Sequence, residues 1–292
     1  MAIYPDHLEE HGVKEILQDG LCQAVGFDGD DCLFKGEGLP EIARYKGANI
    51  YESVLDITQR GMSGGLSWEE GFAERLKILQ LTDADIKILG DIYASNITPH
   101  AADVIRVLKM QGIEPLIISG GIRQAIVPVA ESLGVPAENV YANTVLPDNK
   151  GFFTLYDTDT PLSQGRKDVL VSDIRRQRSL IGRLGMVGDG HMDMRAITGS
   201  GIKIGFCAYE SRDSVKNASN VYIIKASFLT VAPLVLGVEG VKKLVADFPG
   251  ERFFIVQAIR QLQADVVFNA EAIAFGRKLQ ELADNLETEQ VA

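Results

Sequence analysis

The acidic residues best placed to do chemistry stand together directly after an apolar run. Residues 24–27 are Ala-Val-Gly-Phe, and Asp28-Gly29-Asp30-Asp31 then brings three carboxylates within four residues. Side chains two residues apart in an extended chain point the same way, so Asp28 and Asp30 are expected to converge just beyond a buried strand. Like charges held this close require a proton or a cation among them. One carboxylate could attack phosphorus while the second protonates the leaving alcohol, although a polar strand end with solvated acids fits the same pattern.

Three further motifs carry groups that such a reaction needs. Ser119-Gly120-Gly121 follows another apolar run and offers a hydroxyl and free backbone N–H groups to an anion. The basic pair Arg166-Lys167 opens a predicted helix and supplies a cation, without indicating which of the two acts. Gly188-Asp189-Gly190-His191-Met192-Asp193 adds two carboxylates that could complete a Mg²⁺ site with the first pair. Taken singly, these motifs also fit a strand-to-helix turn, a solvated basic pair or a polar loop.

The elements that position these motifs alternate between apolar runs and helical patterns. Such alternation predicts an α/β fold with a doubly wound, mainly parallel sheet covered by helices on both faces. Strands are expected at about 22–27, 114–119, 140–143, 184–187, 202–206 and 221–224. Helices are expected at 6–19, from an N-cap at Thr98 to Gly112, and at 122–133, 167–178, 211–218 and 228–245, with a β-hairpin at 144–160. Ligands of such sheets bind beyond the carboxyl ends of the strands, where all the polar motifs fall.

Two segments do not follow the alternating pattern. Residues 35–94 hold apolar positions at helical spacing without a convincing strand, and the segment after about residue 250 reads as two helices. We therefore expect a catalytic core of residues 1–35 and 95–245, a small helical cap of 36–94 and a C-terminal helical extension of 246–292. The apolar residues of the extension are expected to pack on the core and to contribute to a homodimer.

Composition narrows the partners and the compartment. The formal net charge of −11 argues against nucleic acid or an anionic membrane as a partner, but a local cation can still admit a small anionic ligand. No stretch has the flanks of a signal peptide or the length of a membrane span. The three cysteines are odd in number and widely spaced, which favours a reducing cytoplasm over a disulfide framework.

The order of the four motifs and their common place at one end of one sheet resemble the haloacid dehalogenase superfamily of phosphatases, and within it the phosphoserine phosphatases. The resemblance covers about residues 10–245 and continues through the cap. The segments that carry it are Phe27-Asp28-x-Asp30, Ile118-Ser119-Gly120-Gly121-Ile122-Arg123, residues 135–143, Gly188-Asp189-Gly190-x-x-Asp193-Met194 and residues 201–207.

This resemblance implies a role for each motif. Asp28 would be the nucleophile and Asp30 the general acid and base. Mg²⁺ would be held by the Asp28 side chain, the main-chain carbonyl of Asp30 and Asp189, with Asp193 behind them. The phosphoryl oxygens would be bound by Ser119 and Gly120. Lys167 would be the active-site cation, although Arg166 fits some spacings as well.

The resemblance also assigns residues of the cap. Glu37 falls where the family binds the substrate's amino group, and Arg75 where it binds the carboxylate. Met62 and Trp68 fall where a methionine and an aromatic residue line the pocket. Trp68 and Arg75 are seven residues apart on one predicted helix and therefore share a face.

These residues together predict Mg²⁺-dependent hydrolysis of a small phosphorylated metabolite through an aspartyl phosphate, with O-phosphoserine as the leading substrate. A phosphotransferase that passes the phosphoryl group to another alcohol and a phosphatase for a sugar or polyol phosphate are the near alternatives. A non-catalytic ligand-binding or scaffolding protein is the alternative from another class. Four residues depart from the family pattern and put the leaving group in question, namely Asp31, Cys32, Thr144 and Met192.

Overall fold

A seven-stranded sheet forms the centre of the molecule in the computed structural model, which describes residues 22–197 and 201–288. The strand order is β3-β2-β1-β6-β7-β8-β9, and every neighbouring pair is parallel except β8 with β9. The strands are β1 (Cys22–Phe27), β2 (Glu114–Ile122), β3 (Val140–Asn143), β6 (Arg183–Gly188), β7 (Gly201–Phe206), β8 (Val221–Ile223) and β9 (Val266–Phe268). The predicted α/β class and its six strands are confirmed, while the predicted helix at 6–19 lies outside the described residues.

Strand β1 is central because it is apolar on both faces. Ala24, Val25 and Phe27 are fully buried, as expected of a parallel strand covered by helices on two sides. Its neighbours β2 and β6 both run parallel to it, with Phe27 beside Ile117 and Val187. The carboxyl ends of three strands therefore meet at one edge. Asp28 follows β1, Asp189 follows β6, and Ser119 lies in the last part of β2.

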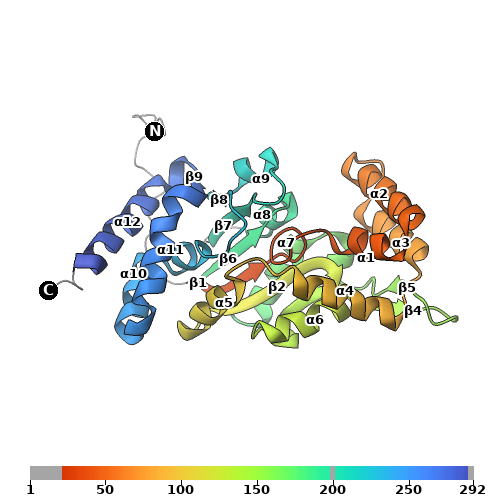
Figure 1. Cartoon of the computed structure of the whole chain (residues 1–292), viewed down its shortest axis with the longest axis horizontal. Helices are drawn as coiled ribbons and strands as arrows, with labels where there is room; N and C mark the ends of the chain where they lie inside the picture. The colour runs from red at the N-terminus through yellow and green to blue at the C-terminus, as the bar shows by residue number, and fades with distance from the viewer. Residues whose placement is uncertain (1–21, 198–200, 289–292) are drawn as a thin grey trace.

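Four of the five helices between β1 and β2 form the helical insertion that was predicted there. They are α1 (Gly38–Lys46), α2 (Ala48–Met62), α3 (Trp68–Leu79) and α4 (Asp83–Ser95). Capping boxes at Ser67 and Thr82 fix where α3 and α4 begin. Helices α1–α3 stand together at one end of the molecule, whereas α4 runs back along α6 of the sheet layer (Figure 1). The insertion is thus anchored to the sheet layer through its last helix.

The other core helices are α5 (Ala101–Met110), α6 (Arg123–Ser132), α7 (Lys167–Gln177), α8 (His191–Ala196) and α9 (Asp213–Ala218), and the hairpin consists of β4 (Val145–Pro147) and β5 (Phe153–Tyr156). The prediction that Thr98 caps the helix after the insertion is wrong. Helix α5 begins three residues later, after His100 in a left-handed conformation. The buried Thr98 hydroxyl instead donates to the carbonyl oxygen of Cys32 at 2.6 Å and so ties the loop after β1 in place.

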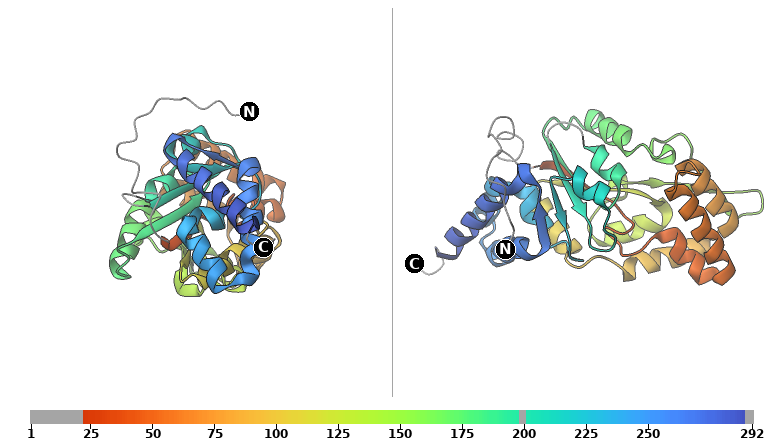
Figure 2. Two further views of the ribbon diagram at one scale, coloured as in Figure 1. Left: turned by 90° about the vertical axis from the view of Figure 1, so that its left-hand side faces the viewer. Right: turned by 90° about the horizontal axis from the view of Figure 1, so that it is seen from above.

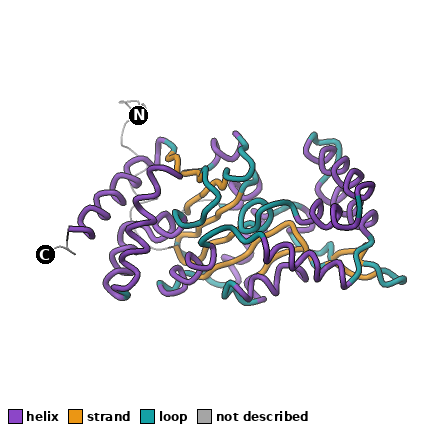
Figure 3. Tube along the Cα trace, viewed as in Figure 1, coloured by secondary structure: helices purple, strands orange, loops and turns teal. Residues whose placement is uncertain are grey.

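The C-terminal region contains α10 (Val231–Asp247), α11 (Arg252–Asp265) and α12 (Ile273–Thr288), gathered at the end of the molecule opposite α1–α3 (Figure 2). The prediction of helices alone after residue 250 is wrong, because Val266–Phe268 forms β9 and closes one edge of the sheet (Figure 3). The apolar residues here pack into the main core, among them Ile255, Ile259 and Leu279. The division into core, cap and extension stays a prediction.

None of the helices within residues 22–197 and 201–288 combines the length and the apolar character needed to cross a membrane.

Candidate active site

A cavity of about 580 Å³ lies beyond the carboxyl ends of the central strands and beneath the inserted helices. Its walls come from the loop after β1, from α1–α3, from the end of β2, from the start of α7, and from the segments that follow β6 and β7. Nine of the predicted site residues line it, namely Asp28, Asp30, Glu37, Trp68, Arg75, Gly120, Lys167, Asp189 and Asp193. Segments far apart in the sequence therefore meet at one cavity.

The other three predicted site residues are not among those that line the cavity. Ser119 is fully buried, its Oγ accepts the Gly121 N–H at 3.0 Å, and a Cβ on Gly29 would lie 2.5 Å from that Oγ. Arg166 is exposed and its Nε pairs with Asp168 at 2.9 Å. Met62 is the last residue of α2, and its side chain lies outside what the structure describes. The geometry thus leaves Lys167, and not Arg166, as the member of the basic pair inside the cavity.

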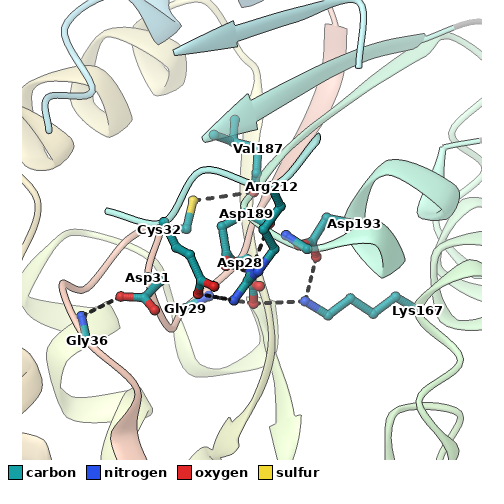
Figure 4. Close-up of polar contacts among 12 residues, drawn as sticks. Asp28, Gly29, Asp31, Cys32, Gly36, Lys167, Val187, Asp189, Asp193 and Arg212 are labelled. Atoms are coloured by element: carbon teal, nitrogen blue, oxygen red, sulfur yellow. Dashed lines mark hydrogen bonds and ion pairs between the residues drawn. The ribbon is translucent and has the colours of Figure 1, made fainter. Parts of the chain in front are cut away.

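Asp28 is held at the base of the cavity by the backbone around it. Its N–H donates to the carbonyl oxygen of Val187 on β6 at 2.9 Å, and the Gly29 N–H donates to its Oδ1 at 2.7 Å. The Nζ of Lys167 lies 2.8 Å from the same Oδ1 and 2.6 Å from Oδ1 of Asp193 (Figure 4). A carboxylate this firmly oriented beside a buried cation is well prepared to attack an electrophile.

Lys167 is charged despite its burial. Its side chain is 4% exposed, and burial alone would lower the pKa of its ammonium group. The charges of Asp193 and Asp28 outweigh that effect and hold the pKa above its ordinary value. The ammonium therefore remains a fixed positive charge at the floor of the site.

Three carboxylates crowd the same point. One oxygen each from Asp28, Asp189 and Asp193 lies within 4.8 Å of the others. Burial and the nearby charge of Asp28 raise the pKa of Asp189 to about 9 and that of Asp193 to about 7, even though Arg212 donates to Asp189 and Lys167 to Asp193. The two cations do not balance the acids, and hard oxygen donors in excess of positive charge suit a divalent cation such as Mg²⁺.

Asp30 differs from the other acids in what surrounds it. Burial, followed by the nearby charge of Glu37, raises the pKa of its carboxyl well above the ordinary value, while contacts from the Tyr93 hydroxyl and the Gly38 N–H act in the opposite direction. Its Oδ1 is buried and has no hydrogen-bond partner among the described residues. A carboxyl whose pKa is raised in this way holds its proton more strongly than an ordinary aspartate does, as a residue that gives a proton to a leaving group requires.

Asp31 and Cys32, the two residues after Asp30 that depart from the family pattern, make their contacts within the loop and not in the cavity. Asp31 has a left-handed backbone with φ of 49°, and its Oδ1 accepts the Gly36 N–H at 2.9 Å. Aspartate tolerates this conformation better than most residues do. Cys32 is fully buried, and its Sγ donates to the Val187 carbonyl oxygen at 3.6 Å. Asp31 therefore closes the turn that leads from the sheet into the cap.

Three side chains of the inserted helices and their N-terminal end line the same cavity, namely the carboxyl of Glu37, the guanidinium of Arg75 and the indole of Trp68. Burial and the charge of Asp31 raise the pKa of Glu37, against the lowering effect of Arg75. The Nε of Arg75 donates to the Gly71 carbonyl oxygen at 3.1 Å, which sets the direction of its side chain along α3. The Trp68 ring stacks on Phe72 at 4.9 Å between centroids and lies over Gly120, where an added Cβ would come 3.6 Å from the indole.

Two residues of this region were not expected from the sequence. Arg212, in the loop after β7, donates to the main-chain oxygen of Asp189 at 3.0 Å and also pairs with its carboxylate. Its place after a strand end could have indicated it, since the other motifs follow the same rule. Tyr93 comes from α4 and is 2% exposed, so it reads as a core residue in the sequence and no local signal marks it.

Comparison with known proteins agrees with this geometry. The family model described as haloacid dehalogenase-like hydrolase matches residues 25–198, more than half of the chain. The chain belongs to the haloacid dehalogenase-like hydrolase family. Every predicted site residue lies inside the range matched by this hydrolase family, whereas Arg212 and the C-terminal helices lie beyond it.

Individual members of the family give more detailed matches. The chain is 34% identical over 186 residues to a chloroplastic phosphoserine phosphatase of Arabidopsis thaliana, covering 63% of this chain and 62% of that protein. It is 30% identical over 223 residues to a phosphoserine phosphatase of Drosophila melanogaster, covering 76% of this chain and 81% of that one. A solved structure of a phospho-aspartyl intermediate analogue of phosphoserine phosphatase matches with a TM-score of 0.61 and 25% identity, over 72% of this chain and 96% of that one.

Proposed function

We propose that this protein hydrolyses a small phosphomonoester with Mg²⁺ through an aspartyl phosphate on Asp28. The observation that carries the proposal is the pairing of Asp28 with Lys167 at 2.8 Å at the base of the cavity. The nearby Asp189 and Asp193 support it, as does the raised pKa of Asp30. The family and the solved phospho-aspartyl analogue point to the same chemistry.

The first step in this mechanism is the attack of an Asp28 oxygen on phosphorus. The bond from phosphorus to the ester oxygen breaks, and Asp30 gives its proton to the leaving alcohol. The ammonium of Lys167, together with Ser119 and Gly120, stabilises the charge on the phosphoryl oxygens. Mg²⁺, held by Asp28, the main-chain carbonyl of Asp30 and Asp189, with Asp193 behind them, would add positive charge there when bound.

The second step uses the same residues with water in place of the alcohol. Asp30, now a carboxylate, takes a proton from water, whose oxygen attacks phosphorus. The acyl phosphate bond breaks, which frees the Asp28 carboxylate and releases inorganic phosphate. Asp30 then holds a proton again, as it did before the first step. The cap excludes bulk water during the first step, so that the alcohol leaves before water reacts.

The substrate we propose is O-phosphoserine, bound by charged groups of the cap. Glu37 would bind the substrate's ammonium and Arg75 its carboxylate, while Trp68 and Met62 line the pocket. Glu37 and Arg75 already act on one another's pKa, and both line the cavity that holds Asp28. The relatives from Arabidopsis thaliana and Drosophila melanogaster carry the name of this activity.

Phosphate release from O-phosphoserine, measured with and without Mg²⁺ beside a panel of sugar and polyol phosphates, tests this proposal. We expect Mg²⁺-dependent turnover of O-phosphoserine, and a rise in KM in Glu37→Gln and Arg75→Met. Glu74→Gln is the matched control, because this residue lies on α3 but pairs with Arg60 near the surface at 3.1 Å. Faster turnover of a sugar phosphate would contradict the substrate, and a labelled phosphoryl group found on an added alcohol would show a transferase. Lack of turnover on the whole panel would favour a binding or scaffolding protein.

We further propose a reducing compartment such as the cytoplasm and self-association as a homodimer. Cys22, Cys32 and Cys207 are buried free thiols, which suits reducing conditions. On α11, Phe253 is 79% exposed, and it is the large apolar residue of the C-terminal helices that a second copy could cover. Light scattering of the full chain at increasing concentration tests the dimer.

A further inference from the structure

Met192 is an apolar side chain in a cavity whose floor is made of charged groups. It lies in the first turn of α8, between Asp189 and Asp193 in the sequence, and is 39% exposed. Among the large apolar side chains that stay exposed in residues 22–197 and 201–288, it is the one that lines the cavity. Methionine donates no hydrogen bond, and its flexible thioether adapts to apolar groups of varied shape. Its place in the cavity therefore points to an apolar part of a bound molecule.

Gly165 allows Met192 and Trp68 to lie next to one another. It has a left-handed backbone with φ of 65° and carries no side chain. A Cβ at this position would lie 3.4 Å from the Cβ of Trp68 and 3.6 Å from the Sδ of Met192, so a side chain of the cap and one of the core approach the same point. The indole of Trp68 extends from there to Gly120, where an added Cβ would lie 3.6 Å from the ring. The indole and the thioether thus form one apolar surface of the cavity, the Trp68–Met192 wall.

This wall lies beside the groups that we propose to act at phosphorus. Trp68 contacts Gly120, and Met192 stands between Asp189 and Asp193 in the sequence. In a phosphomonoester the carbon nearest to phosphorus is the ester carbon, which is separated from it by one oxygen. That carbon carries only hydrogens beside the amino-acid carbon in O-phosphoserine, whereas in O-phosphothreonine it carries a methyl group. The methyl group is the apolar partner that O-phosphoserine does not offer to the wall.

We propose that Met192 and Trp68 determine specificity at the ester carbon, and that the protein accepts phosphorylated amino acids whose ester carbon carries a methyl group, the class of O-phosphothreonine. This inference rests on the proposed phosphatase function and deepens it. O-phosphothreonine has the same phosphoryl, ammonium and carboxylate groups as O-phosphoserine, so Asp28, Glu37 and Arg75 serve both esters. The added methyl group packs on the Trp68–Met192 wall, which removes apolar surface from water.

Phosphate release from the two esters tests the role of Met192. We expect the wild type to hydrolyse O-phosphothreonine with a kcat/KM no more than about fivefold below that for O-phosphoserine. Met192→Ser should lower kcat/KM for O-phosphothreonine about tenfold, mainly through KM, because one methyl group in an apolar pocket has an effect of at least that size. The same variant should lose less than about twofold on O-phosphoserine, which also verifies that it is folded.

Two further variants separate the wall from a general effect of substitution. Met192→Leu keeps an apolar side chain of similar volume and should retain the turnover of O-phosphothreonine. Leu155→Ser is the matched control, because Leu155 is an apolar residue of β5 that is 51% exposed and does not line the cavity. It should leave the ratio of the two activities unchanged.

Trp68 is the one tryptophan of the chain, so its fluorescence reports binding at the wall without turnover. Asp28→Asn protein would be titrated with each ester, and Met192→Ser in this background should weaken the binding of O-phosphothreonine alone, about tenfold. Equal losses for both esters, no loss for either, or a larger preference of the wild type for O-phosphoserine would overturn the inference. Wild-type protein that turns over neither ester would instead contradict the proposed function, and the titration would still decide the inference.

Discussion

Replacement of Lys167 by methionine removes the positive charge at the floor of the site while keeping most of the side chain's volume. The Nζ of Lys167 lies 2.8 Å from Asp28 and 2.6 Å from Asp193, and the side chain is 4% exposed. Breaking a buried ion pair by removing one partner typically costs about 3–5 kcal/mol, because the remaining charge stays buried without compensation. We expect the free energy of unfolding of Lys167→Met to fall by about that amount near pH 8 in the absence of metal.

The loss of stability in Lys167→Met should be smaller at lower pH. Burial and the charge of Asp28 already raise the pKa of Asp193 to about 7 with Lys167 present, and the pKa rises further without it. A carboxyl whose pKa is higher in the folded than in the unfolded state adds stability when protonated, and this contribution is lost as pH rises. The difference between variant and wild type should therefore shrink between pH 8 and about pH 5.5, by at most about 1.4 kcal/mol, because the wild-type carboxyl titrates about one unit below the upper pH.

Urea unfolding at both pH values and phosphate release provide the assays. We expect kcat of Lys167→Met to fall by about 10²–10³, the usual effect of losing one group that stabilises developing charge. Arg166→Met is the matched control, since its guanidinium is exposed and pairs with the half-buried Asp168. The free energy of unfolding of Arg166→Met should fall by less than about 1 kcal/mol, and the variant should keep its activity. Similar losses in both variants, or an active Lys167→Met, would refute the reasoning.

Three further expectations concern the metal, the cap and the thiols. Added Mg²⁺ should raise the Tm of the wild type but not that of Asp189→Asn, because a ligand bound only by the folded state stabilises it; an equal shift in both would place the metal elsewhere. Asp85→Ala should lower the free energy of unfolding in urea by about 1–2 kcal/mol, because Asp85 closes the capping box of α4 and pairs with Lys46 at 2.8 Å. An unchanged urea midpoint would contradict this. An aromatic disulfide reagent near pH 8 should label no thiol of the native protein and all of them after denaturation, because burial raises the pKa of Cys22, Cys32 and Cys207. Rapid native labelling would contradict that burial.

The parts of the site predicted from sequence are those that follow buried parallel strands. Such strands are continuous apolar runs, so the polar residue that ends each run is conspicuous, as at Asp28, Ser119 and Asp189. Parallel strands also end at the same edge of a sheet, which brings these residues together without further information. The pairing of Lys167 with Asp28 follows less directly, because two adjacent basic residues differ only in the direction that the helix gives them.

The parts that escaped prediction depend on contacts between distant segments. Tyr93 is one apolar-face residue of a helix in the sequence, and its nearness to Asp30 is created only when α4 packs along α6. Strand β9 has three residues, Val266–Phe268, and a run this short does not distinguish helical from strand periodicity. Thr98 has the residue type and spacing of an N-cap, but its hydroxyl bonds to Cys32 instead.

The central claim is that Asp28 becomes phosphorylated during turnover. The enzyme would be mixed with O-phosphoserine and Mg²⁺, quenched in acid within the first turnover, digested and analysed by mass spectrometry. The account predicts one phosphoryl group on the wild-type peptide that contains Asp28, and neither this modification nor phosphate release in Asp28→Asn. Steady phosphate release by Asp28→Asn, or a phosphoryl group on another residue of the wild type, would contradict it.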